Sequence, residues 1–519
     1  MKPTRRKLQK HLALGALALG AAASAQAQYT PPPPPIPFPG FINQWMRQEN
    51  PYLAAWDIGG NLRLRYEIKD GYGNPGVGSA TSKPNSQSLD FRKNNADVEN
   101  DYLMSKLRFH IGYTDKWWSA YVEARSSIVG GDERLSYFAN PLPAGTKNRK
   151  GSSPESDTLD LHQAYITVGN HKEFPLSLKI GRQELSYGEE RLVGAFAWNN
   201  IGRVFDAAKL RWQNEWFAAD FFAGQVVIPE DDRFNVSNDH DLFSGVYATS
   251  QKISHHLLDL YFLARNADEH AIADEPSPQF PQPSARDIYT VGLRFKSKPG
   301  EVGNWDYSLE SAYQFGNFQD RRLGLSAPRL TQDAWMMVLQ GGYTFNDAWG
   351  TPRLGLEYSY ASGDSNVHDK THGTFENLFP TNHKFYGYMD FISLQNIHDL
   401  RGEFTIKPHP RVSLALEGHG FWLADTHDNF YNVGGAPRGG ATLGANVGNG
   451  NGYGVNPSYS NFVGTELDVI AGFAVNKFTQ LEAGYGHFFA GDYINQSLAS
   501  SSRGSRDANF FYLQLSVNF

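Results

Sequence analysis

Basic side chains gather within residues 181–212 in an arrangement suited to binding anions. Arg191 and Arg203 lie in a loop between two expected strands, and Lys209 and Arg211 occupy alternate positions of the second strand. The planar guanidinium of arginine fits the geometry of carboxylate and phosphate groups. The stretch therefore predicts contact with an anionic solute, and the question becomes which elements position these side chains.

Apolar and polar residues alternate from Gly59 to the end of the chain, which is the period of β-strands. Leu107 and Phe109, for example, flank Arg108, and the last alternating segment ends on Phe519. A terminal phenylalanine is typical of bacterial outer-membrane barrels. We expect about 18 such segments, an even number. They lie near residues 59, 103, 116, 158, 174, 204, 216, 241, 256, 286, 305, 333, 352, 396, 411, 464, 479 and 508.

The connections between these segments differ in length in a regular way. Connections after even-numbered strands are short, as at 114–115 and 476–477, whereas those after odd-numbered strands are long, as at 362–395 and 424–463. Short periplasmic turns and long outer loops are typical of outer-membrane barrels. We therefore predict an all-β, single-domain transmembrane antiparallel β-barrel of about 18 strands. It would span residues 59–519 in the outer membrane of a Gram-negative bacterium, with both termini in the periplasm.

A closed barrel also meets the physical demands of a membrane, because hydrocarbon cannot satisfy backbone N–H and C=O groups at an open edge. Trp117 and Trp118 beside a short turn lie where an aromatic girdle is expected. No apolar run of about 18 residues follows the N-terminus, which excludes a helical membrane protein. A barrel of this strand number encloses an aqueous lumen. Function is therefore expected on the inward face and in loops folded over it.

The N-terminal part is expected to lie outside the barrel. Residues 1–27 combine a basic start, an apolar stretch and the small-residue cleavage site Ala25-Gln26-Ala27, which predict a secretory signal peptide. Residues 28–58 begin with a run of prolines and are interpreted as a stiff periplasmic segment. Without the five basic residues of the signal peptide, 42 basic residues stand against 54 acidic ones, a net charge near −12. This balance argues against nucleic acid as a partner.

Residue groupings that would support catalysis are not evident in the sequence. The chain has no cysteine, and we find no metal-binding histidine pair on an expected helix, no Gly-x-Ser-x-Gly motif and no phosphate loop. His162, His383 and His419 are isolated and are interpreted as wall or loop residues. We expect no enzyme activity, no catalytic residue, no metal centre and no cofactor. The acidic run 230–232 could hold Ca²⁺, although a solvated outer loop is the favoured interpretation.

If the apolar face of each strand meets lipid, the inward face carries charges of both signs. The inward bases are Arg63, Arg65, Lys106, Arg108, Arg125, Lys179, Lys209, Arg211, Arg265, Arg294, Lys296, Arg353 and Arg401. The inward acids are Glu67, Glu123, Asp259, Asp306, Glu310, Glu357, Glu403, Glu417, Glu466 and Glu482. Most of these charges are expected to pair across strands, at little gain per pair in a wet wall. An anion pathway needs a subset of bases left unpaired.

Two sequence blocks resemble a known family. The first is GRQELSYGEERLVG from Gly181, followed by Trp198-Asn199-Asn200 and GRVFDA from Gly202, and the second is FENLFPTNHKFYGYMDF from Phe375. Both are similar to the alginate-export family of outer-membrane porins, and the resemblance covers essentially the whole mature chain. It implies a monomeric barrel with a constriction lined by arginine and lysine that passes a polyuronate.

The resemblance also implies site residues. The substrate-pathway candidates are Arg63, Arg65, Arg108, Arg125, Lys179, Arg182, Arg191, Arg203, Lys209, Arg211, Arg353, Arg401, His383 and Lys384. His383 and Lys384 belong to the second block and are expected on a loop that dips into the pore. The acids of the same blocks, Glu184, Glu189, Asp206 and Asp390, are expected to brace the arginines.

We therefore expect an outer-membrane channel that passes an anionic polysaccharide, by resemblance alginate or a similar uronate, by passive diffusion. Its expected partners are the polysaccharide, the lipid bilayer with lipopolysaccharide, and periplasmic proteins of polymer synthesis and export. The first alternative is a general or substrate-specific porin for small anions or sugars. A barrel enzyme acting on lipid or polysaccharide, and an adhesion or scaffold barrel with a blocked lumen, are further alternatives.

Overall fold

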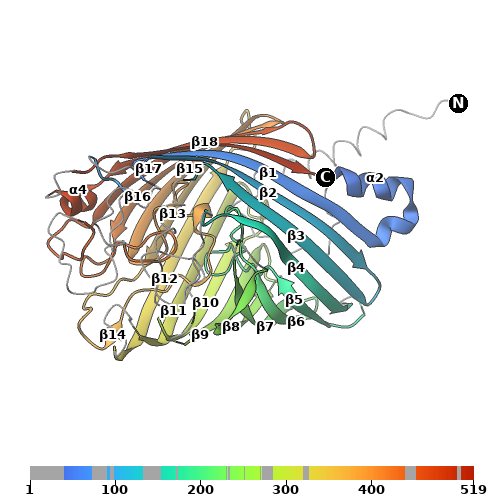
Figure 1. Ribbon diagram of the computed structural model, residues 1–519, viewed down its shortest axis with the longest axis horizontal. Helices are drawn as coiled ribbons and strands as arrows, with labels where there is room; N and C mark the ends of the chain where they lie inside the picture. Colours follow the sequence, from blue (N-terminus) through green and yellow to red (C-terminus); the bar gives the residue numbers. More distant parts are fainter. Residues whose placement is uncertain are drawn as a thin grey trace.

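The computed structural model describes residues 40–72, 90–93, 99–132, 153–170, 173–229, 231, 234–250, 252–268, 271, 284–319, 327–438, 452–499 and 504–519. The expected signal peptide lies outside these ranges, as do the prolines at 31–35. The described strands form one barrel (Figure 1).

A single sheet of nineteen strands makes up the barrel in the described part of the chain. The strands are β1 (Trp56–Asp70), β2 (Glu99–Thr114), β3 (Trp118–Gly130), β4 (Asp157–Gly169), β5 (Leu176–Gln183), β6 (Phe205–Gln213), β7 (Phe217–Ile228), β8 (Val236–Ser250), β9 (His256–Ala267), β10 (Arg286–Ser297), β11 (Trp305–Gln319), β12 (Arg329–Thr344), β13 (Arg353–Ala361), β14 (Thr371–His372), β15 (Ile397–His409), β16 (Val412–Leu423), β17 (Phe462–Ala474), β18 (Thr479–Ala490) and β19 (Ala508–Asn518). The short β14 only adds a parallel pairing to β12. The other eighteen strands form the wall, so the predicted strand number and all-β class are confirmed.

The sheet closes where β1 pairs with both β2 and β19 in antiparallel register. Leu62 lies opposite Leu107 on one side and opposite Val517 on the other. At the end of the seam, the Gly60 N–H donates to the Phe519 carbonyl at 3.0 Å, and the Phe519 N–H donates to the Gly60 carbonyl at 2.8 Å. Closure leaves the wall without an unpaired edge, as a hydrocarbon environment requires.

The two faces of the wall differ as the alternation predicts. On β2, Leu107 and Phe109 are each 42% exposed on the outside, whereas Lys106 and His110 are almost completely buried on the inside. The outside therefore suits lipid, and the inside carries the charges. No described helix is both long enough and apolar enough to span a bilayer.

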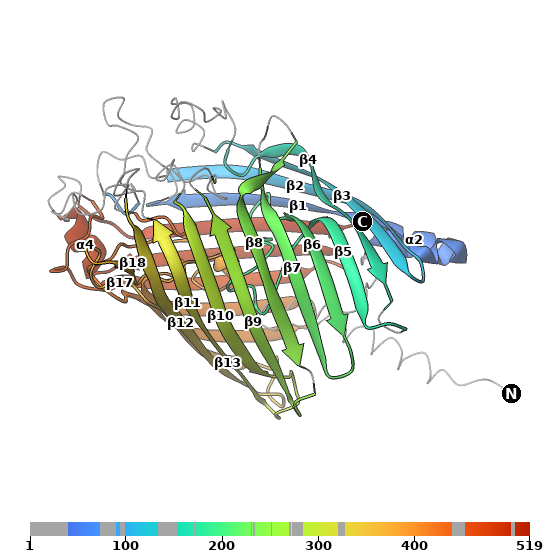
Figure 2. The same ribbon diagram turned by 90° about the horizontal axis from the view of Figure 1, so that it is seen from below.

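The connections follow the predicted asymmetry. Short turns such as 115–117, 214–216 and 475–478 lie at one end of the barrel, the end with the C-terminus and α2 (Phe41–Glu49), which is followed by the short helix η2 (Pro51–Ala55) (Figures 1 and 2). Longer connections lie at the other end with α4 (Asp492–Leu498).

Two long connections reach into the barrel. We call residues 184–204, between β5 and β6, the first inward loop. Residues 373–396, between β14 and β15, are the second inward loop and contain the short helix η4 (Asn382–Lys384). These loops are the segments that the two sequence blocks cover, and they bring the site together.

Candidate functional site

The two inward loops are joined to each other by backbone hydrogen bonds. The Gly194 N–H donates to the Phe379 carbonyl at 2.7 Å, and the Phe379 N–H donates to the Leu192 carbonyl at 2.9 Å. The Thr381 N–H donates to the Glu190 carbonyl at 2.9 Å. Each loop thus satisfies backbone groups of the other, which would otherwise need partners elsewhere inside the barrel.

Trp198 of the first loop connects the wall to the second loop through its two ring faces. The Arg65 guanidinium lies 3.7 Å from the ring centre, and the His383 ring stacks at 3.8 Å with an interplanar angle of 10°. A cation over an indole face is attracted by the negative potential of the ring. Arg65 and His383 are both pathway candidates, and both are largely buried in this stack.

Basic residues of the first three strands hold the backbone of the first inward loop. Arg63 and Lys106 donate to the Ala197 carbonyl at 3.1 and 2.8 Å. Arg125 donates to the Ile201 carbonyl at 2.9 Å. These cations replace the hydrogen bonds that a loop would otherwise make to water, so their role in this structure is to position the loop.

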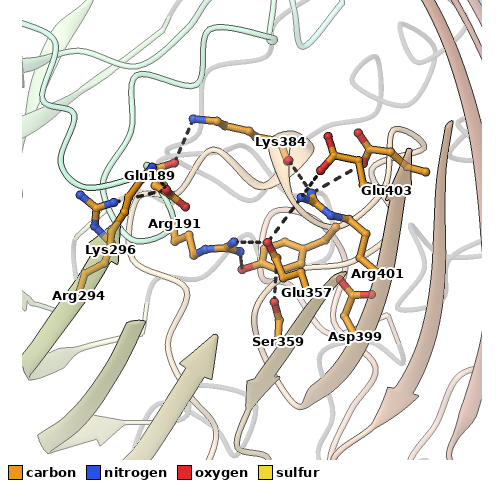
Figure 3. Close-up of polar contacts among 12 residues, drawn as sticks. Glu189, Arg191, Arg294, Lys296, Glu357, Ser359, Lys384, Asp399, Arg401 and Glu403 are labelled. Carbon is orange, nitrogen blue, oxygen red and sulfur yellow. Dashed lines mark hydrogen bonds and ion pairs between the residues drawn. The ribbon is translucent and has the colours of Figure 1, made fainter. Parts of the chain in front are cut away.

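A charged cluster fixes the loops to the opposite part of the wall (Figure 3). Glu357 of β13 forms an ion pair with Arg191 of the first loop at 2.7 Å. Its carboxylate also lies 3.5 Å from the guanidinium of Arg401 on β15. Glu189, also of the first loop, pairs with Lys296 at 2.6 Å and lies 3.4 Å from Arg294, both of β10. All six side chains are buried.

The ionisation of Glu189 follows from these neighbours. Burial by itself would raise the pKa of Glu189, but Lys296, Arg294 and Arg191 outweigh burial and lower the pKa to about 2. Glu189 is therefore a carboxylate at any physiological pH and neutralises part of the charge of the cations around it.

Most of the other predicted cations also have carboxylate partners. Arg108 pairs with Glu184 at 3.1 Å, Arg125 with Asp157, Arg182 with Asp206 at 2.8 Å, and Arg353 with Asp306 at 2.7 Å and Glu403 at 2.8 Å. Arg203 donates to the carbonyls of Gly194 and Pro380 at 3.3 and 2.8 Å, which ties the two loops together. The expected bracing by Glu184, Glu189 and Asp206 is seen in these contacts, whereas Asp390 pairs with His383 at 3.1 Å.

Three cations with few carboxylate partners lie on β5 and β6, and we call Lys179, Lys209 and Arg211 the β5–β6 basic group. Lys179 lies opposite Lys209 in the sheet register. Lys209 and Arg211 share one carboxylate, that of Asp220, at 3.4 and 3.0 Å. Lys179 lies 3.5 Å above the Tyr165 ring and makes no ion pair within the described residues. The side chains of Lys209 and Arg211 are each 20% exposed, unlike the buried cluster at Glu357.

Lys384 of the second loop resembles the β5–β6 basic group in its partial exposure and its few carboxylate partners. It is half-buried and donates to the Glu189 carbonyl at 3.3 Å, and it has no ion pair in the described part of the chain. Its position on a loop inside the barrel agrees with the sequence expectation for His383 and Lys384.

Histidines that are isolated in the sequence have carboxylate partners in the structure. His162 pairs with Glu184 at 3.0 Å, and His419 pairs with Asp399 at 3.0 Å. Among the described residues, no group of three or more histidine, aspartate or glutamate side chains could hold a metal ion. In the acidic run of the β7–β8 connection, Asp231 accepts from the N–H and hydroxyl of Thr158 at 2.9 Å, and residues 230 and 232 lie outside the described ranges.

The sequence-based candidate set omits several residues that shape the site. Lys296 and Arg294 were expected on the inward face but not at the constriction, and they hold Glu189. Trp198 lies within the first sequence block. An aromatic residue beside Asn199 and Asn200 was the only feature of the sequence that could have indicated its place in the site. Arg265, which contacts Asp241 and the second-loop Glu376 at 2.6 and 3.2 Å, is a further inward base with a loop partner.

Comparison with known proteins agrees with this geometry. Residues 80–506 match the family described as alginate export. The chain belongs to the alginate export family. The match covers both inward loops and every strand except β1 and β19. A search of curated protein sequences gave no significant match.

A solved structure shares the barrel fold with this member of the alginate export family. Acinetobacter baumannii OccAB1 aligns with a TM-score of 0.53 and 10% identity over 89% of this chain and 96% of that one. The Pseudomonas aeruginosa outer membrane protein OprD aligns with a TM-score of 0.49 and 11% identity over 89% and 94%. At such identities the similarity extends to the fold alone. Family and fold together describe an outer-membrane channel of the porin type.

Proposed function

We propose that this channel passes an anionic polysaccharide, alginate or a similar polyuronate, by passive diffusion past the two inward loops. The observation that carries the proposal is the β5–β6 basic group, in which Lys209 and Arg211 share one carboxylate, that of Asp220, and Lys179 lies over the Tyr165 ring. Partly exposed cations of this kind can replace the counterions of a uronate carboxylate. Lys384 on the second loop offers a further weak site.

Several weak sites in succession suit a polymer better than one strong site. Conduction requires binding that is favourable enough to enter and weak enough to leave. The buried pairs at Glu357 and Glu189 leave those guanidinium and ammonium groups little affinity for a passing carboxylate, because their charge is already compensated. We therefore assign Arg191, Arg294 and Arg401 to loop positioning, and the β5–β6 basic group to solute contact.

A substrate-specific porin for small anions or sugars is the second candidate. It is favoured by the two inward loops, whose packed aromatic residues include Phe379, Phe385 and Tyr386, all buried. Loops packed in this way restrict the cross-section that a polymer would need. In either case we propose a transporter without enzyme activity, with the short-turn end and both termini in the periplasm, and with lipopolysaccharide around the long-loop end.

The test is single-channel conductance in planar bilayers with oligouronates of increasing length. For a polyuronate channel we expect anion selectivity and block that strengthens with oligomer length. The combined substitution of Lys179→Ala and Lys209→Ala should weaken the block about tenfold, as loss of about 1.4 kcal/mol of binding predicts. Lys116→Ala, in an exposed turn where Lys116 pairs with Glu173, is the control with a charge change outside the lumen.

Two results would count against the proposal. Block by uronates that does not depend on length would favour the small-solute porin. Block that is as strong in the double variant as in Lys116→Ala would remove the β5–β6 basic group from the pathway. Uncharged glucan oligosaccharides of the same lengths show how much of any block is steric.

A further inference from the structure

The helix α2 lies at the short-turn end of the barrel, beyond the start of β1 (Figure 1). Polar contacts fix it there. Asn43, which is almost completely buried, donates to Asp57 at 2.7 Å, and Arg47 donates to the Trp56 carbonyl at 2.6 Å. Because Asn43 and Arg47 are four residues apart, they share one face of the helix, and this face is turned towards the rim.

Phe41 and Trp45 are also four residues apart and share a different face of α2. The Phe41 ring contacts the rings of Phe478 and Phe519, with centroids 6.0 and 6.3 Å away. Trp45 is 61% exposed, and no described part of the chain covers it. The question is whether this apolar face is directed to the lumen, to water or to the membrane.

The position of the Phe519 ring shows on which side of the wall the apolar face of α2 lies. A Cβ atom on Gly60 would lie 2.4 Å from the Phe519 ring, so the ring covers Gly60. Gly60 has the same strand parity as Tyr66 and Ile68, which are exposed on the outer wall. The Phe519 ring, and Phe41 packed on it, therefore lie on the outer side of the rim.

Asp57 has the opposite parity to Gly60 and lies on the inner side with Arg63 and Arg65. The helix thus straddles the rim, with Asn43 towards the lumen and Phe41 and Trp45 towards the outside. The outer side at this end of the barrel also exposes Trp118, by 42%, and Trp305, by 60%. Tryptophan side chains at this level are typical of the membrane–water interface.

From this geometry we infer that α2 is an interfacial anchor whose Phe41 and Trp45 face inserts among the phospholipid headgroups at the short-turn end. The occupant of the exposed face is the bilayer that surrounds the wall, because the face continues that wall without a break. An amphipathic helix of this type lies in the plane of the interface with its apolar side immersed. The inference does not depend on the identity of the solute.

Site-directed spin labelling tests the inference, because the chain contains no cysteine and any single introduced cysteine is the only labelling site. Glu49→Cys places the label one turn after Trp45 and keeps the tryptophan, and Trp45→Cys gives a second reading. Leu107→Cys on the outer wall is the lipid reference, and Glu215→Cys, in a turn where the side chain is 72% exposed, is the water reference. Each full-length protein is reconstituted in phospholipid vesicles, and collision rates with oxygen and with a water-soluble nickel complex are measured.

The expected result is a label depth of about 5–10 Å into the headgroup and acyl boundary at position 45 or 49, between the two references. A nickel accessibility equal to that of Glu215→Cys at both positions would overturn the inference, since it places the face in water. Labels protected from both collision partners would overturn it as well, since they show that protein covers the face.

Discussion

At the scale of single residues, most of the basic side chains inside the barrel have a structural role. Arg63 and Arg125 donate to carbonyls of the first inward loop, and Arg191 and Arg401 approach one carboxylate, Glu357. A buried ion pair contributes little net stability, but removal of one partner leaves an uncompensated buried charge. Only cations with fewer partners remain available to a solute.

Glu357 offers a test at this scale. In Glu357→Gln, Arg191 and Arg401 lose a shared carboxylate, so we expect a destabilisation of about 3–5 kcal/mol, measured by urea unfolding in detergent. The reversal potential in a salt gradient should shift towards higher anion selectivity, because two guanidinium groups become less compensated. Asp306→Asn is the matched control, since Asp306 is less buried and Arg353 keeps Glu403 as a partner. An unchanged reversal potential in Glu357→Gln would show that these guanidinium groups do not influence ions in the lumen.

At the scale of elements, the connections that follow β13 and β16 are joined by hydrogen bonds to one carboxylate, that of Asp428. Asp428 accepts from the Asp364 N–H at 3.0 Å, from the Thr374 hydroxyl at 2.6 Å and from the Tyr431 hydroxyl at 2.9 Å. Burial, with the nearby Asp428 charge, raises the pKa of Asp364 to about 6, although backbone donors oppose the rise. The second inward loop starts beside Asp428, because Thr374 belongs to that loop. The stability of these hydrogen bonds therefore affects the position of the loop.

The raised pKa of Asp364 predicts a pH dependence. Between the unfolded pKa near 3.8 and the folded pKa of about 6, the folded state binds more protons than the unfolded state. The contribution of Asp364 to the free energy of unfolding is therefore fully present below this pH window. It falls as pH rises through the window, by at most about 3 kcal/mol. Asp364→Asn should raise the melting temperature at pH 7.5 and leave it nearly unchanged at pH 4. An equal change at both pH values would contradict an elevated pKa at this position.

At the scale of the whole molecule, Phe519 lies at one end of the seam that closes the barrel. Phe519 completes the β1–β19 seam with two backbone hydrogen bonds to Gly60, and its ring covers Gly60 on the outside. The same ring contacts Phe41 of α2, so α2 and β19 meet at one point of the rim. The seam, α2 and Phe519 are therefore in contact with one another.

Deletion of Phe519 should impair closure. We expect a lower fraction of the heat-modifiable folded form after insertion into vesicles, because two hydrogen bonds of about 1 kcal/mol each and the ring contact are lost. Phe519→Tyr keeps both and should insert like the natural protein. Should the deletion variant insert at the natural rate and to the natural extent, Phe519 would have no part in closing the seam.

The amino-acid sequence by itself determined the wall. Alternation at period two is a local signal, and it placed eighteen strands and put Lys106 and Arg401 on the inner face, as the structure confirms. The difference in connection length is also local and indicated which end carries the long loops. The family resemblance rested on two contiguous blocks, and both proved to be inward loops.

Only the tertiary structure decided which charges are compensated. Glu189 meets Lys296 across 107 positions of sequence, and Arg191 meets Glu357 because the first inward loop turns into the lumen. No local pattern encodes such a meeting, since it depends on the path of the loop and on closure of the seam. The same holds for α2, whose outward face is defined only by the contact of Phe41 with Phe519, a residue at the other end of the chain.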